Sequence, residues 1–161
     1  MDRETYVFCR LLLFAGPRIS EALELTPRRL DTDERQVVFR TLKRRKRVFR
    51  AAPVPASLMT ELQELAKGKA TDERLWTWCR VTAWRRIKKV MEAAEIQGPR
   101  AVPRGLRHQF GVETMRESVP LPCTQRLLGH ASPNTTVIYQ HPTGSDMRGL
   151  LSKFWRAYGE S

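Results

Sequence analysis

Hydrophobic residues recur at helical spacing over most of this chain. Several stretches keep apolar positions three or four residues apart, and glycine or proline separates one stretch from the next. This period is typical of amphipathic helices that pack on one core. It predicts helices over residues 3–15, 17–25, 56–66, 81–94, a segment after Pro103 that carries Arg107, 122–128 and 146–158.

The first two predicted helices meet at a glycine and a proline. Gly16 suits the position just after a helix, and Pro17 suits the first turn of the next one. Arg18 and Glu21 lie three positions apart in the second helix and therefore share a face. The residues expected on the inner side of the first helix are Tyr6, Cys9 or Arg10, Leu13 and Phe14.

The helix over residues 81–94 separates apolar from basic positions. The positions expected to face the core are Val81, Trp84, Ile87, Val90, Met91 and Ala94. The basic residues of the opposite face are Arg80, Arg85, Arg86, Lys88 and Lys89. We interpret Trp76, Trp78 and Trp84 as core residues rather than as platforms on which bases stack.

One short region changes from helical to alternating spacing. Apolar side chains alternate with others between Gln36 and Leu42, and residues 47–53 form a second extended run. This pattern predicts a hairpin whose tip is Lys43-Arg44-Arg45-Lys46. The whole chain is therefore predicted to be one α+β domain, mainly helical, with a small antiparallel β-sheet at one edge.

The charge of the chain points to a polyanionic partner. Lys and Arg number 29 against 17 Asp and Glu, which gives a formal net charge of +12. The densest basic run surrounds the predicted hairpin tip and comprises Arg40, Lys43, Arg44, Arg45, Lys46, Arg47 and Arg50. Arginine matches pairs of phosphate oxygens with its planar fork of donors, so we expect nucleic acid as the partner.

Several other classes of protein are disfavoured. No apolar run approaches the roughly 20 residues of a membrane span. The three cysteines, Cys9, Cys79 and Cys123, lie far apart, which favours reduced thiols and a cytoplasmic protein. With three histidines and no clustered carboxylates, we expect neither a metal ion nor a cofactor.

Four motifs carry the candidate chemistry. The first is Gly-Pro-Arg-Ile-Ser-Glu over residues 16–21, and the second is the hairpin with the Pro-Val-Pro that follows it at 53–55. The third is Gly-Leu-Arg-His at 105–108. The fourth contains Leu-Gly-His ending at His130 and, nine positions later, Tyr139. Arginine, histidine and tyrosine in this order are typical of a phosphate-binding site with a phenolic nucleophile.

In order and spacing, these motifs resemble those of the tyrosine recombinases of the phage integrase family, over nearly the whole chain. The resemblance implies the catalytic core of an enzyme that cuts and rejoins double-stranded DNA through a 3′-phosphotyrosyl link, without metal or ATP. Tyr139 would then be the nucleophile. Arg18 and Arg107 would hold the non-bridging phosphate oxygens and neutralise the charge of the transition state, and His130 would donate a hydrogen bond to the same phosphate.

The general acid and two departures follow from the same resemblance. We favour Lys43 as the acid that protonates the 5′ leaving oxygen, with Lys46 as the alternative. Arg104 occupies a place where the family commonly has histidine; it can hydrogen-bond the phosphate, but its pKa makes it a poor base. A direct catalytic role for His108 is disfavoured, and this side chain is expected to face the core. Pro17 replaces a usual apolar residue.

Two contacts and the DNA-binding surface are also expected. Glu21 either orients Arg18 through a charge-assisted contact or belongs to an exposed helix pair. The apolar face of the last helix, over residues 147–158, packs on a second protomer or on its own chain. The residues expected to bind DNA are Arg44, Arg45, Lys46, Arg47, Arg85, Arg86, Lys88 and Lys89.

The resemblance leaves the domain composition and the activity open. Family members add an N-terminal helical domain that completes a clamp around DNA, whereas here residues 1–161 are expected to form the catalytic domain alone. The chain would be a fragment, a small recombinase or a protein that relies on a partner. A homotetramer is expected on paired DNA sites, with a monomer as the free form. The alternatives are a catalytically silent DNA-binding module and a type IB topoisomerase.

Overall fold

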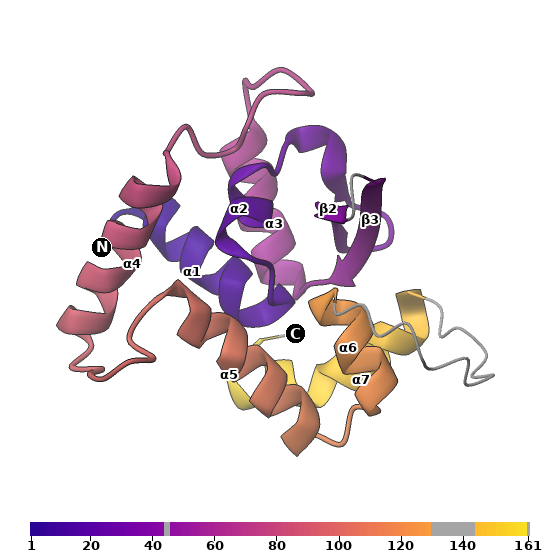
Figure 1. Cartoon of the computed structure of the whole chain (residues 1–161). Coiled ribbons are helices and arrows are strands. Elements are labelled where there is room, and N and C mark those ends of the chain that lie inside the picture. Colours follow the sequence, from indigo (N-terminus) through magenta and orange to yellow (C-terminus); the bar gives the residue numbers. More distant parts are fainter. Residues whose placement is uncertain (44–45, 130–143, 161) are drawn as a thin grey trace.

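The computed structural model describes residues 1–43, 46–129 and 144–160. Over these residues, helices pack around a central helix and a small sheet lies at one end (Figure 1). The predicted α+β fold with a small antiparallel sheet at one edge is confirmed. The helices are α1 (Arg3–Ala15), α2 (Ile19–Leu23), α3 (Ala56–Ala66), α4 (Arg80–Ala93), α5 (Pro103–Arg116), α6 (Leu121–Leu128) and α7 (Gly144–Ala157), with a 3₁₀ turn at Pro27–Arg29.

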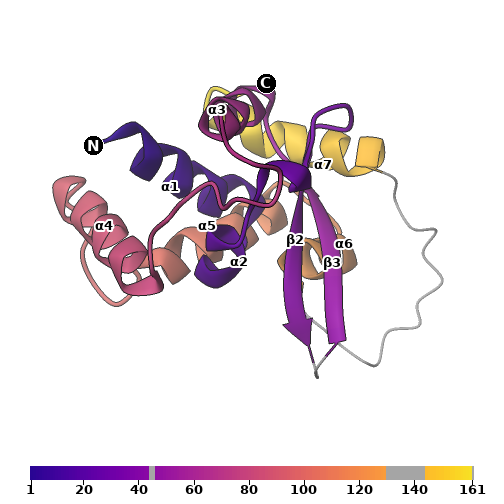
Figure 2. The ribbon, with the colours of Figure 1, turned by 90° about the horizontal axis from the view of Figure 1, so that it is seen from above.

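The sheet contains the predicted hairpin and one further strand. Strands β1 (Leu30–Asp31), β2 (Gln36–Lys43) and β3 (Lys46–Pro53) are antiparallel in the order β1-β2-β3. Lys43 pairs with Lys46 at the last described step of the hairpin. The sequence did not predict β1, because two residues are too few to show alternation. The hairpin extends away from the helices, at the opposite end of the molecule from α4 (Figure 2).

Helix α1 forms the centre of the structure, and both of its ends are defined by specific residues. The Asp2 carboxylate accepts the backbone N–H of Thr5 at 3.0 Å and so caps the start of the helix. Gly16 ends it with a φ of 60°, in the left-handed region. A Cβ atom on Gly16 would lie 2.5 Å from a ring carbon of Phe110, so both backbone and packing require glycine here.

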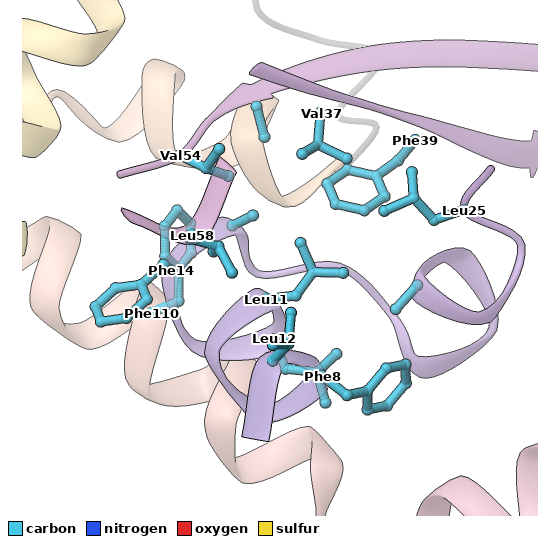
Figure 3. Packing of buried hydrophobic residues seen from close by; sticks show 14 of the residues in the cluster. Phe8, Leu11, Leu12, Phe14, Leu25, Val37, Phe39, Val54, Leu58 and Phe110 are labelled. Atoms are coloured by element: carbon cyan, nitrogen blue, oxygen red, sulfur yellow. The ribbon is translucent and has the colours of Figure 1, made fainter. Parts of the chain in front are cut away.

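The buried side of α1 agrees only in part with the predicted one: Arg10 and Phe14 are buried as expected, but the most deeply buried residues are others. Val7, Phe8, Leu11 and Leu12 are fully buried, whereas Tyr6 is 43% exposed. The helix contacts α2, α3, α4 and α5, so its apolar residues are covered from several directions. Periodicity could not choose one face of a helix that is buried on most sides. Figure 3 shows its side chains clustered with others from α3, α5 and the sheet, including Leu58, Phe110, Val37 and Phe39.

Helix α2 begins later than predicted. Its first residue is Ile19, and Arg18 is the capping residue with an extended backbone, at φ −71° and ψ 151°. Pro17 therefore precedes the helix and contributes no helical turn. The Glu21 carboxylate accepts the backbone N–H of Arg18 at 2.8 Å, which fixes the helix start at this point.

The buried face of α4 was also predicted wrongly in part. Ala83, Ile87 and Met91 face the core, and the four-residue spacing of these residues makes a narrow stripe. Val81 and Trp84 are instead 55% and 44% exposed. Among the other tryptophans, Trp76 is fully buried as expected and Trp78 is half-buried against the core. The long apolar side chains of α4 thus do not all belong to its inner face.

The C-terminal helix α7 packs on its own chain. Leu151, Phe154 and Trp155 are buried, and the Phe154 ring lies 5.7 Å from that of Phe14 and 5.9 Å from that of Phe110. The Arg10 guanidinium of α1 forms an ion pair with Glu160, just beyond α7. Of the two packing alternatives for this helix, the structure therefore has the one within the chain. None of the described helices is long and apolar enough to cross a membrane.

Candidate active site

An open groove of about 840 Å³ runs between the start of α2, one face of α5 and α6. Basic side chains gather along it from the capping position of α2, from the start of α4 and from α5: Arg18, Arg80, Arg104, Arg107 and His108. Three of the predicted catalytic residues, Arg18, Arg104 and Arg107, therefore line one groove. Because the cations lie within one concave surface, the groove favours an anion such as a phosphate diester.

Arg18 is held in this groove by Glu21. The Nη1 atom of Arg18 donates to the Glu21 carboxylate at 2.8 Å, and the backbone N–H of Arg18 donates to the second oxygen at 2.8 Å. The Glu21 side chain is only 4% exposed, whereas that of Arg18 is 44% exposed. This geometry favours the orienting contact over an exposed helix pair. One end of the pair is fixed in the interior, and the other presents a guanidinium to the groove.

The buried Glu21 carboxylate is surrounded by donors. Besides the two bonds from Arg18, it accepts a hydrogen bond from the Thr41 hydroxyl of β2 and one from Arg50 of β3 at 2.8 Å. Burial alone raises the pKa of Glu21, but the Arg50 charge and these hydrogen bonds together lower it to about 2. Glu21 is thus a carboxylate at all physiological pH values.

Folding stability should depend on this carboxylate in acid. Glu21 has its lowered pKa, about 2 against an ordinary 4.5, in the folded state, so its contribution is complete above pH 4.5 and is lost as the pH falls through 2. The contribution is on the order of 3 kcal/mol. We expect the difference in free energy of unfolding between wild type and Glu21→Gln, measured with urea from pH 2 to 7, to shrink toward the acid end. A difference that does not change with pH would contradict this.

Arg107 connects two helix ends below the groove. Its Nη1 atom donates to the carbonyl of Gly16 at the end of α1, and its Nη2 atom donates to the carbonyl of Leu128 at 2.6 Å. Burial, and then the nearby charges of Arg18 and Arg50, lower the pKa of Arg107 to about 10. Since this value is still well above neutrality, the side chain remains a cation. Its remaining N–H groups are available to a ligand.

Arg50 is a site residue whose role the sequence analysis missed. Its side chain is 8% exposed and donates to Glu21 and to the carbonyl of Leu127. The guanidinium carbon lies 4.7 Å from the centroid of the Phe39 ring. Phe39 and Arg50 are directly opposite in the β2–β3 register and therefore share a face. This pairing was the signal in the sequence that could have identified Arg50. Phe39 belongs to the predicted apolar face of β2, so the residue opposite it in the hairpin should share that face.

Two polar neighbours of Arg107 on α5 are solvent-facing. Arg104 and His108 lie one turn apart on α5, and both are exposed along the groove. The expectation that His108 faces the core is therefore wrong. Pro103 forms the first turn of α5, so Arg104 stands near the helix start, at the positive end of the helix dipole.

Several predicted residues lie outside what the structure describes. His130 and Tyr139 fall within residues 130–143, and Arg44 and Arg45 are likewise outside the described residues. For Lys43, Lys46 and Arg47 the backbone is described as strand but the side chains are not. The choice between Lys43 and Lys46 as general acid therefore stays a prediction.

The predicted DNA-binding residues of α4 do not form one free surface. Arg85 and Lys89 are exposed and line a second groove of about 800 Å³ between α1 and α4. Arg86 forms an ion pair with Asp2 at 2.9 Å and lies 4.4 Å from the centroid of the Trp78 ring. The Nζ atom of Lys88 lies 3.9 Å from a carboxylate oxygen of Glu92. Arg86 therefore also anchors α4 to the start of α1.

The described residues contain no group of three or more His, Cys, Asp or Glu side chains that could hold a metal ion. Cys9, Cys79 and Cys123 are free thiols, as expected. Burial raises the pKa of Cys9 to about 11, so this thiol is not reactive at neutral pH.

Comparison with known proteins identifies relatives of the whole described fold. The chain is 30% identical over 161 aligned positions to the tyrosine recombinase XerA of Thermococcus onnurineus, an alignment that covers 94% of this chain and 55% of that protein. It is 29% identical to the tyrosine recombinase XerD of Corynebacterium glutamicum, over 97% of this chain and 53% of that protein. The chain thus spans about half the length of these relatives.

The fold has counterparts among solved structures. A crystal structure of XerA recombinase matches 95% of this chain and 58% of its own, with a TM-score of 0.69 and 24% identity. The integrase of transposon Tn1549, solved in complex with transposon right end DNA, matches 92% of this chain and 58% of its own, with a TM-score of 0.63 and 19% identity. The phage integrase family model matches residues 2–145. The chain therefore belongs to the phage integrase family.

Proposed function

We propose that this chain is the catalytic domain of a site-specific DNA recombinase that cuts and rejoins strands through a 3′-phosphotyrosine intermediate. The observation that carries the proposal is the groove in which Arg18, Arg104 and Arg107 converge, with Arg18 oriented by a buried carboxylate. A groove of this kind supplies fixed positive charge where a phosphodiester gains negative charge during displacement. The relatives named as tyrosine recombinases support the same reaction.

The proposed reaction is a displacement at phosphorus. The phenolic oxygen of Tyr139 attacks, its proton passes to solvent, and an oxygen–phosphorus bond forms as the bond to the 5′ oxygen breaks. Lys43, or alternatively Lys46, protonates the departing oxygen, which becomes a 5′-hydroxyl. Arg18, Arg104 and Arg107 bind the non-bridging oxygens together with His130. Attack by a 5′-hydroxyl on the phosphotyrosine reverses the steps and joins the strands.

The partner of this domain is double-stranded DNA, bound mainly through its phosphates. The predicted DNA-binding residues belong to α4 and to the β2–β3 hairpin, and α2 and α5 lie between these two elements (Figure 1). DNA that contacts both ends therefore passes the groove. Because binding neutralises phosphates with lysine and arginine, affinity falls as salt rises. We further propose that monomers assemble into a homotetramer on paired DNA sites. This assembly would take place in the cytoplasm and recombine the DNA of a mobile element.

Covalent trapping on nicked DNA tests the proposal. The substrate is a pool of end-labelled duplexes of randomised sequence, each with one nick beside the potential cleavage position. When such a duplex is cut, a short fragment between the cut and the nick is released, so the strand cannot be rejoined. We expect wild-type protein to retain label in denaturing detergent and to lose it after proteinase digestion. A chain that shifts the pool in a native gel but leaves no detergent-resistant label would contradict the proposed function.

The second candidate is a catalytically silent DNA-binding module of the same fold. One observation favours it: both terminal nitrogens of Arg107 already bind backbone carbonyls, as a purely structural arginine would. Arg104 in place of the family's usual histidine points the same way. The trapping experiment separates the two candidates, since the silent module binds DNA and leaves the backbone intact.

A further inference from the structure

Arg50 connects three elements, β3, α2 and α6, and the last two of these line the groove. It belongs to β3, its Nη2 atom donates to Glu21 of α2, and its Nη1 atom donates to the Leu127 carbonyl in the last turn of α6. With 8% of the side chain exposed, it has little access to a ligand in solvent. Its partners therefore define what it does.

The first connection runs through Glu21 to Arg18. The two oxygens of Glu21 divide their bonds: one faces the Arg18 guanidinium and Thr41, and the other faces Arg50 and the Arg18 backbone. A buried carboxylate needs compensating charge on more than one side to stay ionised. Arg50 supplies that charge from the interior, so the exposed Arg18 can turn its free N–H groups toward the groove.

The second connection runs to the end of α6. Arg50 binds the carbonyl of Leu127 while Arg107 binds that of Leu128, so two cations hold the last carbonyls of this helix. Gly129 follows with a φ of 62°, and a Cβ atom there would lie 3.0 Å from Nε of Arg50. The glycine thus allows the chain to pass close to the guanidinium, one residue before His130.

We propose that Arg50 is a positioning residue for strand cleavage, acting through Glu21 on the orientation of Arg18 and through the Leu127 carbonyl on the end of α6. It does not touch DNA. The inference rests on the proposed function for its kinetic readout, and it assigns a role to a residue outside the set of predicted catalytic and DNA-binding side chains.

The test compares Arg50→Gln with Arg148→Gln. Arg148 is a matched control because it forms an ion pair between elements, with Glu34 at 3.1 Å, away from the groove. We expect Arg50→Gln to cleave the nicked DNA pool at least about tenfold more slowly than wild type, a smaller loss than the roughly 100- to 1000-fold for removing a preorganised donor itself, because Arg18 is still present. DNA affinity and the behaviour of Arg148→Gln should stay unchanged. Equal losses of cleavage and affinity would overturn the proposal, because they indicate a direct DNA contact or a folding defect.

The pH dependence of cleavage provides a readout that a merely structural role would not change. Without Arg50, its positive charge no longer opposes the effect of burial, so the pKa of Glu21 rises. As the pH falls, Glu21 is then protonated at a higher pH than in wild type, and Arg18 loses its carboxylate partner there. The pH at which the cleavage rate falls on the acid side should therefore be higher in Arg50→Gln than in wild type. In Arg50→Lys it should return toward the wild-type value. An acid limb at the wild-type position would overturn the connection through Glu21.

Two further variants, Glu21→Gln and Gly129→Ala, test the proposal if Arg50→Gln does not fold normally. In a double-mutant cycle, the losses of cleavage rate caused by Arg50→Gln and Glu21→Gln should be non-additive, because both variants break the same contact. Additive losses would overturn the connection through Glu21. Gly129→Ala should slow cleavage as Arg50→Gln does, because its Cβ atom displaces the guanidinium. Gly68→Ala is its control, with a φ of 76° and nothing within 4 Å of the added atom. A Gly129→Ala variant no slower than Gly68→Ala would count against the second connection.

Failure of the proposed function can be told apart from failure of this inference. If wild-type protein traps no DNA, carbon-13 NMR titration of the Glu21 carboxyl still tests the first connection. The pKa of Glu21 is expected to rise from about 2 in wild type toward its ordinary 4.5 in Arg50→Gln. An unchanged titration would overturn the role of Arg50 whatever the activity of the chain.

Discussion

Tyr139→Phe is expected to abolish the covalent protein–DNA complex while leaving DNA binding intact. The phenyl ring keeps the size and shape of the side chain but has no oxygen that could attack phosphorus. Because a covalent intermediate requires that oxygen, the loss should be complete rather than partial. The measurement is detergent-resistant label on the nicked DNA pool, with affinity followed separately by fluorescence anisotropy.

Tyr6→Phe is the matched control for this prediction. Tyr6 is 43% exposed on α1 and does not line the groove, so its hydroxyl should be dispensable for cleavage. Trapping by Tyr139→Phe at the wild-type level would identify another nucleophile. Loss of trapping in both variants would point to a general effect of removing a hydroxyl. The first result would remove Tyr139 from its proposed role, and the second would show that the loss of trapping is not specific to Tyr139.

Arg107→Ala is expected to reduce cleavage by roughly 100- to 1000-fold, the usual effect of removing one preorganised donor at a developing charge. It should also destabilise the fold, because Arg107 holds the carbonyls of Gly16 and Leu128 at the ends of α1 and α6. Each hydrogen bond of this charged kind is worth roughly 1.5–3 kcal/mol. Cleavage kinetics and urea unfolding measure the two effects independently.

Arg18→Ala separates these two effects. Its side chain is 44% exposed and donates only to Glu21 among the described residues, so its loss should leave the free energy of unfolding much closer to wild type. The cleavage defect should nevertheless be comparable with that of Arg107→Ala. If Arg107→Ala destabilised the chain but cleaved DNA at the wild-type rate, Arg107 would be a structural residue and the silent module would be favoured.

Local chemistry in the chain predicted much of the framework correctly. The helix breaks at Gly16 and Gly129 and the alternating hairpin strands each depend on residues a few positions apart, so they were readable before folding. The arginines at 18 and 107 were selected in the same way, because each lies inside a recognisable motif; both line the groove, and their catalytic roles stay predictions. Residues 130–143, which carry His130 and Tyr139, lie outside the described residues, and those two assignments remain predictions from the sequence.

Only the tertiary structure decided which faces are buried and which charges meet. The apolar run of α1 offers several possible inner faces, and the contacts with four other helices select Val7, Phe8, Leu11 and Leu12. Arg50 looked like one more member of a basic run, yet the fold buries it between Glu21 and the end of α6. The sequence by itself determined the chemical groups and their local elements. The charge pairing of buried groups was set by the fold, because it depends on segments that are far apart along the chain and become neighbours only when the core closes.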